Sequence, residues 1–178
     1  MMTLKQVLII SIVTMLFLTA LPVNEDCFAD TNRVAITKAI PKKWFKGARG
    51  YDKALALQKQ IGADIFMYFS RPNTANEKGL CSWFEAKGLN TLAVRKHLRN
   101  YIKVKVVLPG NPKNQKLAKK MYVKKCPSVF ILHPNGWKRR VMVFNWSKKR
   151  PKLLSDTELV ELFQQNNSIS TNTVLKGP

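Results

Sequence analysis

The residues Ile65-Phe66-Met67-Tyr68-Phe69 limit the fold of this chain more than any other stretch. A strand with one face in water alternates apolar and polar side chains, whereas this run is continuously apolar and rich in aromatic residues. It therefore predicts a short central strand that is covered on both faces. The stretch over residues 71–79 holds proline, asparagine and glycine and indicates a loop.

Helical spacing of apolar residues predicts one helix before this strand in the sequence, over residues 52–61, and two after it, over residues 80–86 and 91–98. Gly62 is the expected stop of the first helix, and Gly88 is expected to kink or divide the later region. Asn111 and Pro112 predict the start of another helix, as cap and first residue. Ser155 with Glu158 fits a capping box and predicts a closing helix.

Two further patterns predict strands. Residues 101–108 alternate apolar positions with Lys103 and Lys105, which indicates a strand with one face in water. Residues 129–132 and 141–144 flank Pro134-Asn135-Gly136, which has the chemistry of a hairpin turn. This order of elements predicts an α/β domain in which helices flank a mixed central sheet.

Two motifs narrow the fold to one family. The first is Lys78-Gly79-Leu80-Cys81-Ser82-Trp83-Phe84-Glu85, and the second is Val123-Lys124-Lys125-Cys126-Pro127-Ser128-Val129-Phe130. Together they resemble the thioredoxin family over roughly residues 50 to 165. In that family a Cys-x-x-Cys motif opens the helix after the central strand, and a cis-proline at the start of the hairpin faces it. Pro127 matches that proline.

The resemblance is incomplete at the redox motif. Cys81 aligns best with the second cysteine of the family, which puts Lys78 in place of the first. In the other register Cys81 is the first cysteine and Phe84 replaces the second. Dithiol exchange needs an attacking thiolate and a second, resolving thiol, so an efficient general oxidoreductase is disfavoured. Lys78 either lowers the pKa of a neighbouring thiol or lies in water.

Cys126 directly precedes Pro127, and the resemblance implies that it faces the helix that carries Cys81. The two thiols then form a structural bridge, form a reversible redox pair, or stay unpaired in the interior. A bridge would close a loop of about 45 residues and stabilise the domain by roughly 3 to 4 kcal/mol. Neither cysteine has further ligands nearby in the sequence, and we assign no metal and no cofactor.

The amino end resembles a signal peptide. Lys5 precedes an apolar run of 15 residues over positions 7–21, and Cys27-Phe28-Ala29 ends the polar stretch that follows. A membrane-spanning helix needs about 20 apolar residues, so we expect cleavage after Ala29 rather than a permanent membrane span. The product is then periplasmic or extracellular, where disulfides persist. The expected organisation is a signal peptide (1–29), a basic segment (30–50), a thioredoxin-like domain (51–166) and a flexible tail (167–178).

The charge of the chain suggests a second class of partner. The 31 basic and 10 acidic side chains give a net charge of +21, which becomes +22 when cleavage removes Lys5, Glu25 and Asp26. Such a charge attracts anionic surfaces and polyanions without selecting one, or is simply a solvated basic surface. No base-reading motif is present, so no specific nucleic acid is expected.

These patterns give two functional hypotheses. The first is an exported thioredoxin-like protein with a degenerate active site and limited thiol–disulfide activity toward protein thiols or disulfides, through Cys81, Cys126, Pro127 and Lys78. The second is a non-catalytic basic binding module for a polyanion or a protein partner. Retention of the partner after both cysteines are replaced would distinguish the second hypothesis from the first.

Overall fold

The computed structural model describes residues 39–146 and 150–168. The expected signal peptide and all but the first two residues of the expected tail lie outside them. In the described part, a five-stranded sheet has the strand order β1-β3-β2-β4-β5. These strands are β1 (Phe45–Lys46), β2 (Ile65–Ser70), β3 (Ile102–Val107), β4 (Ser128–Leu132) and β5 (Lys138–Val141). β3 is parallel to both β1 and β2, whereas β4 is antiparallel to β2 and β5. The predicted mixed sheet is thus confirmed.

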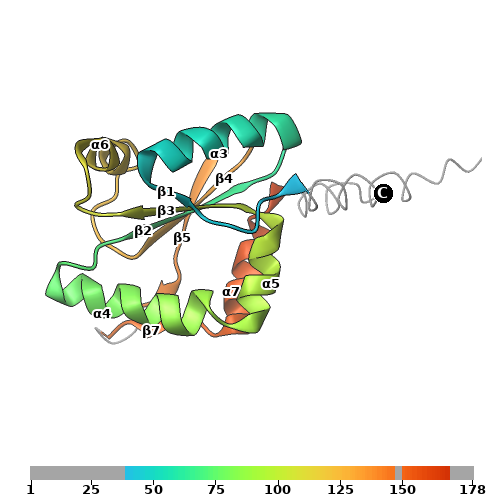
Figure 1. Cartoon of the computed structure of the whole chain (residues 1–178). Coiled ribbons are helices and arrows are strands. Elements are labelled where there is room, and N and C mark those ends of the chain that lie inside the picture. Colours follow the sequence, from blue (N-terminus) through green and yellow to red (C-terminus); the bar gives the residue numbers. More distant parts are fainter. Residues whose placement is uncertain (1–38, 147–149, 169–178) are drawn as a thin grey trace, which may run out of the picture. The chain divides into compact units, whose positions relative to one another are not determined.

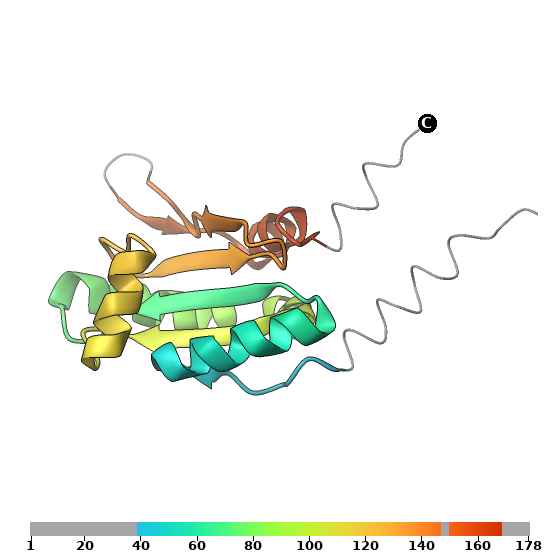
Figure 2. The same ribbon diagram turned by 90° about the horizontal axis from the view of Figure 1, so that it is seen from above.

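Helices cover both faces of the sheet (Figure 1). On one face lie α3 (Gly47–Ile61) and α6 (Pro112–Lys120). On the other lie α4 (Ala75–Trp83), the π-helix η1 (Phe84–Leu89), α5 (Leu92–His97), the 3₁₀-helix η2 (Leu98–Asn100) and α7 (Asp156–Gln165). A separate two-stranded sheet joins β6 (Phe144–Asn145) to β7 (Lys152–Leu153). Figure 2 shows the same layers from above.

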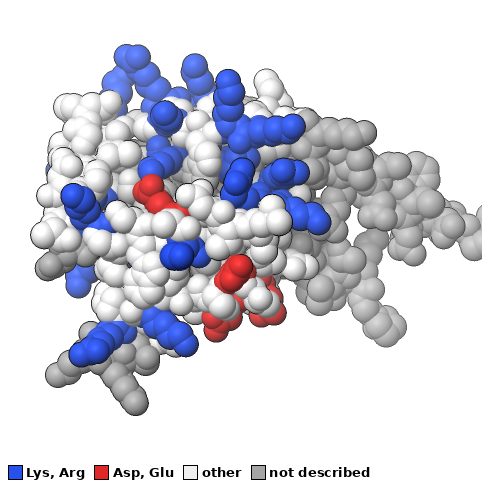
Figure 3. Space-filling view, turned by 60° about the horizontal axis from the view of Figure 1, so that its bottom comes forward, with Lys and Arg blue, Asp and Glu red and all other residues white. Residues whose placement is uncertain are grey.

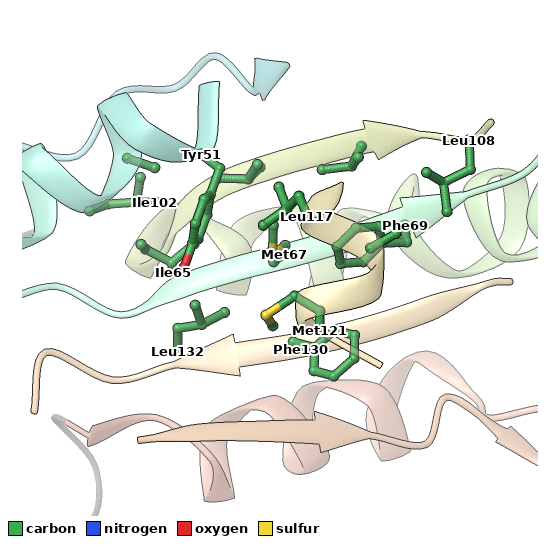
Figure 4. Packing of buried hydrophobic residues seen from close by; sticks show 14 of the residues in the cluster. Tyr51, Ile65, Met67, Phe69, Ile102, Leu108, Leu117, Met121, Phe130 and Leu132 are labelled. Atoms are coloured by element: carbon green, nitrogen blue, oxygen red, sulfur yellow. The ribbon is translucent and has the colours of Figure 1, made fainter. Parts of the chain in front are cut away.

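All six residues of β2 are buried, as expected of a central strand. Ile65, Met67 and Phe69 pack toward α3 and α6, together with Ile102 and other residues that Figure 4 labels. Phe66 and Tyr68 point to the opposite face and pack with Phe84, Phe163 and their neighbours. Strand β2 therefore joins the two halves of the core. Burying each side chain of this size contributes about 1.5–3 kcal/mol to the stability of the folded protein.

The first described helix is longer than predicted. Helix α3 begins at Gly47 rather than near residue 52, although Gly47 and Gly50 are poor helix formers. A Cβ atom at Gly50 would lie 2.9 Å from the backbone of Phe45, so the glycine lets the helix pack directly on β1. At its other end the predicted stop is confirmed, because Gly62 is left-handed with φ 69° and donates its N–H to the Gln58 carbonyl. The folded part therefore includes residues assigned to the basic segment before residue 51.

Two strand predictions need correction. The returning strand of the hairpin is β5, which ends at Val141, because the Trp137 carbonyl accepts the His133 N–H and pairing starts directly after the turn. Phe144 instead pairs with Leu153 in the smaller sheet. The expected wet face of residues 101–108 is also wrong at Lys103, which is only 5% exposed. Its ammonium group donates to the carbonyl oxygens of Pro41 and Tyr101, at 3.0 and 3.3 Å.

Candidate functional site

The helix after the central strand opens at a different place from the one that the sequence suggested. Helix α4 begins at Ala75, and Thr74 is its N-cap residue in extended conformation, so the predicted loop ends there rather than at Gly79. Lys78 is therefore an exposed residue of the first turn, not the residue before the helix. Cys81 is the seventh residue of the helix. Neither expected register of the redox motif is found, because Thr74-Ala75-Asn76-Glu77 opens the helix.

The start of the hairpin has the expected geometry around Pro127. The peptide bond between Cys126 and Pro127 is cis. The hydroxyl group of Ser128 donates to the Lys125 carbonyl at 2.5 Å and accepts a hydrogen bond from the Arg140 guanidinium at 3.0 Å. These two bonds tie the residues around Pro127 to β5, and they place Arg140 beside this segment.

A cleft of about 520 Å³ lies between the start of α4 and the hairpin. It brings together Thr74, Glu77, Cys126 and Pro127, whereas Lys78 and Cys81 do not line it. More than half of its wall is apolar, and Lys125 and Arg140 add positive charge. The remaining lining residues are Leu80, Val141, Met142, Val143, Phe144 and Trp146. Thr74 and Glu77 thus take the place that the resemblance assigned to the redox motif.

Cys81 and Cys126, the two cysteines among the described residues, are unbridged and buried, and each is 3% exposed. Burial is the main reason that the pKa of Cys126 is raised, to about 12, and the charges of Glu77 and Cys81 raise this pKa further. Burial also raises the pKa of Cys81, and interactions with the Arg71 backbone and the Tyr68 hydroxyl partly offset this rise. Both groups are therefore thiols rather than thiolates near neutral pH, and such thiols attack disulfides slowly.

A polar chain connects Cys81 with β3. The Tyr68 hydroxyl donates to Glu85 Oε1 at 2.9 Å, and Lys105 Nζ lies 2.8 Å from the same oxygen. Lys105 also lies over the Tyr68 ring, 5.6 Å from its centroid. Burial, followed by the charges of Cys81 and Glu85, raises the pKa of Tyr68, so this phenol stays protonated and acts as a donor.

At the opposite end of β2 the structure forms a buried cluster that sequence reasoning missed. Asp64 is fully buried and accepts hydrogen bonds from the Ser168 N–H and hydroxyl, at 2.6 and 2.7 Å. His133 Nδ1 lies 3.1 Å from the same carboxylate. The serine donates to the aspartate rather than to the histidine, so this is not the geometry of an activated nucleophile. Its contacts hold the end of the described chain against β2.

Two kinds of feature are not found among the residues that the structure describes. Within residues 39–146 and 150–168 no group of three or more His, Cys, Asp or Glu side chains is placed to hold a metal ion. In the same ranges no helix is both long and apolar enough to cross a membrane. The apolar run near the amino end lies outside these ranges.

Solved structures with the same arrangement of elements identify the fold. The chain is similar to a thioredoxin from Thermus thermophilus, with a TM-score of 0.50 and 24% identity over 70% of this chain and 86% of that one. It is also similar to the oxidised C-terminal domain of DsbD from Neisseria meningitidis, with a TM-score of 0.51, 18% identity, and coverage of 70% and 99%. For a DsbH oxidoreductase the TM-score is 0.52 at 16% identity, with coverage of 72% and 84%. No family model and no curated protein matches the sequence.

The fold is therefore thioredoxin-like, as the sequence predicts. These identities lie below 25%, so they establish the fold and leave the function to be argued from the site. The residues that the sequence analysis did not single out are Thr74 and Glu77. Their spacing is that of a capping box, which is the sequence signal for a helix start at this point, although the Thr74 side chain makes no capping hydrogen bond here.

Proposed function

We propose that this protein is an exported thioredoxin-like binding module whose cleft beside Pro127 holds an extended segment of a partner protein without rapid disulfide exchange. The observation that carries the proposal is the replacement of the redox motif at the start of α4 by Thr74 and Glu77, with both thiols buried nearby. An exchange enzyme needs an exposed thiolate, and neither cysteine supplies one.

The walls of the cleft favour a particular kind of segment. Met142 and Trp146 are exposed apolar side chains on its rim, and buried Val143 and Phe144 lie between them in the sequence. Large exposed apolar side chains around a concavity are typical of interaction sites. Lys125 and Arg140 favour acidic residues in the segment that binds. The expected partner segment is extended and apolar, with acidic neighbours.

Binding to a reduced and carboxymethylated unfolded protein, which carries no thiols, tests this function directly. We expect Met142→Asp to weaken the binding by about tenfold or more, because it places a charge in the apolar wall. Leu92→Asp is the control, since Leu92 is also apolar and is 81% exposed against 56% for Met142, but it lies on α5, outside the cleft. Equal effects of the two variants would count against the cleft.

The cysteines give a second test. Replacing Cys81, which does not line the cleft, with alanine should leave this binding within about twofold. A dithiol mechanism instead predicts measurable insulin reduction by the unaltered protein and its loss in this variant. Alanine is preferred to serine here because a buried hydroxyl group without a partner would itself destabilise the domain.

A slow internal disulfide is the second candidate function of the thiols. Cys81 and Cys126 belong to the same buried cluster on one face of the sheet. Two thiols would lose two protons and two electrons to a disulfide-bearing oxidant and form one bond. Intact mass of the protein from its compartment, alkylated with and without reductant, tests this. Label that appears only after reduction supports the bridge, and a mass of residues 30–178 supports cleavage after Ala29.

The basic surface supports a weaker, less selective interaction. Lys and Arg side chains spread over much of the face in Figure 3, where Asp and Glu are few. With a net charge of +21, the chain should bind heparin or duplex DNA with an affinity that falls as salt rises from about 50 to 200 mM. Binding whose affinity does not change with salt would show that the net charge is not its cause.

A further inference from the structure

A second cavity of about 590 Å³ concentrates positive charge far more than the general surface does. Five cationic side chains line it, Lys42, Arg95, Arg99, Lys103 and Lys105, together with the single carboxylate of Glu85. Lys105 and Glu85 form an ion pair of 2.8 Å, so four cations remain without a carboxylate inside the cavity. The cavity shares no lining residue with the cleft beside Pro127.

The topology explains why these charges meet. Lys103 and Lys105 alternate with the apolar residues of β3 and lie opposite Phe66 and Tyr68 of β2, so both point to the face that carries α5. Strand β1 pairs with only two residues of β3, Val104 and Lys105. The short helices α5 and η2 add Arg95 and Arg99, and the segment before β1 adds Lys42 and Trp44.

The buried Lys103 distinguishes this cavity from a group of exposed lysines on the surface. Its side chain is buried, and two of its three N–H groups are donated to the carbonyl oxygens of Pro41 and Tyr101. Within the described residues these are the two acceptors found for the ammonium group, so one donor is left for a ligand. Buried charges are normally paired, and an anion in the cavity would supply the missing partner.

The walls of the cavity also limit the size and character of the ligand. Trp44 packs edge to face on Phe66 with ring centroids 5.9 Å apart, which fixes its indole ring beside the charged groups. Leu89 and Leu98 contribute apolar surface. A volume of this size suits a small molecule, and several cations next to an aromatic wall suit an organic body with a strongly charged end.

We propose that this cavity binds a small organic anion that carries two or more phosphate groups, with Lys103, Arg99 and Arg95 holding the phosphates and Trp44 contacting the organic part. This site is independent of the proposed role of the cleft. It also differs from general attraction of polyanions, because it places the affinity in one cavity of stated residues.

Calorimetric titration of the purified protein with ATP in magnesium-free buffer, at about 0.15 M salt, tests the proposal. We expect saturable binding of one ATP per chain and no binding of adenosine. The double variant Arg95→Gln/Arg99→Gln should lower the affinity by about tenfold or more, since it removes two charge-assisted contacts. The matched control Lys113→Gln/Lys116→Gln removes the same charge from exposed positions of α6 and should change the affinity by less than about twofold.

Three results would overturn the proposal. The first is equal weakening by both double variants, which would indicate diffuse attraction to the surface. The second is equal binding of adenosine, and the third is the absence of saturable ATP binding. None of them bears on the test of the cleft, which uses different residues and an unfolded protein as its probe.

The pH dependence of ATP binding provides a second, separate readout. Burial, and then the positive charge of Arg99, lower the pKa of Lys103 to about 8. Arg95, Lys105, Lys42 and Glu85 are the other charged groups of the cavity, and they come from the elements packed around Lys103. Because bound ATP would favour the charged form of Lys103, the affinity of the protein for ATP should fall as the pH rises from about 7.5 to 9.5. The variant Lys103→Met, checked for folding by thermal unfolding, should bind more weakly and lose this decline, and an unchanged decline would exclude Lys103 from the site.

Discussion

Burial is the property that separates Cys81 and Cys126 from reactive thiols. The pKa of Cys126 rises from 9.0 to about 12, which lowers its thiolate fraction near pH 8 by up to roughly a thousandfold. We expect iodoacetamide to label the native protein at least about a hundredfold more slowly than the urea-unfolded protein at the same pH. Intact mass over time measures both rates. Labelling of the native protein at the unfolded rate would show that the thiols are accessible.

The buried carboxylate of Asp64 should be a sensitive position for the stability of the fold. Replacing it with alanine leaves His133 and the Ser168 donors without their common acceptor. Losing a buried, hydrogen-bonded charge typically costs about 3–5 kcal/mol of unfolding free energy. Urea denaturation measures the change. Asp52→Ala is the control, because Asp52 is exposed, and it should change the stability by less than about 0.5 kcal/mol.

At the level of single residues, the sequence predicted where the candidate site lies better than it predicted which residues line it. Cys126 and Pro127 line the cleft, as the resemblance implies, whereas Lys78 and Cys81 do not. The prediction placed the helix start by the position of Cys81, since cysteine was the expected chemistry. Counting from the end of the central strand to the Thr74 and Glu77 pair would have placed it correctly. The cluster of Asp64, His133 and Ser168 could not be predicted from the sequence, because these residues are far apart along the chain and only the tertiary structure brings them together.

At the level of elements, two helical glycines provide a paired test of packing. A Cβ atom at Gly88 would lie 2.7 Å from the Phe84 ring, whereas one at Gly79 would meet nothing within 4 Å. Gly88→Ala should therefore destabilise the protein by about 1–3 kcal/mol through overpacking. Gly79→Ala, inside α4, should stabilise it by up to about 1 kcal/mol, because alanine favours the helix. Denaturant midpoints give both values, and the same sign for both variants would contradict the packing around η1.

The elements that the sequence predicted best are those with strong local signals. Both hydrogen bonds of the capping box at Ser155 and Glu158 are present, and Asn111 caps α6 as expected. Predictions failed where contacts distant in sequence decide the conformation. The packing of Gly50 on Phe45 extends α3, and the carbonyl groups around Lys103 allow a lysine to be buried in a strand. Neither effect leaves a periodic pattern that sequence reasoning can detect.

For the whole molecule, the buried ionisable groups predict an uncommon dependence of stability on pH. Lys103 titrates at about 8 in the folded protein and at its ordinary 10.5 when unfolded, so the unfolded chain binds more protons between these values and stability rises with pH. Cys126 has the opposite shift, from 9.0 to about 12, so the folded chain holds more protons above pH 9 and stability falls. Raised pKa values of Tyr68 and Tyr101 add to this fall above pH 10.

Stability should therefore rise from about pH 8 to about pH 9, change little up to about pH 10 while the effects of Lys103 and Cys126 oppose each other, and decline beyond that. Urea midpoints measured at half-unit intervals give the profile. The rise is expected to vanish in Lys103→Met, and the decline should become shallower in Cys126→Ala. A monotonic fall from pH 8 in the unaltered protein would contradict the burial of Lys103.

The contacts of Asp64 also bear on the order in which the chain completes its fold. Its partners are 69 and 104 positions further along, so a chain that leaves the ribosome amino end first exposes this carboxylate long before either partner follows. Until Ser168 emerges, burying Asp64 would cost free energy rather than release it. The contacts between Ser168 and Asp64 can therefore form only after almost all of the described chain has been made, so we expect a chain truncated before Ser168 to be less stable than the full chain.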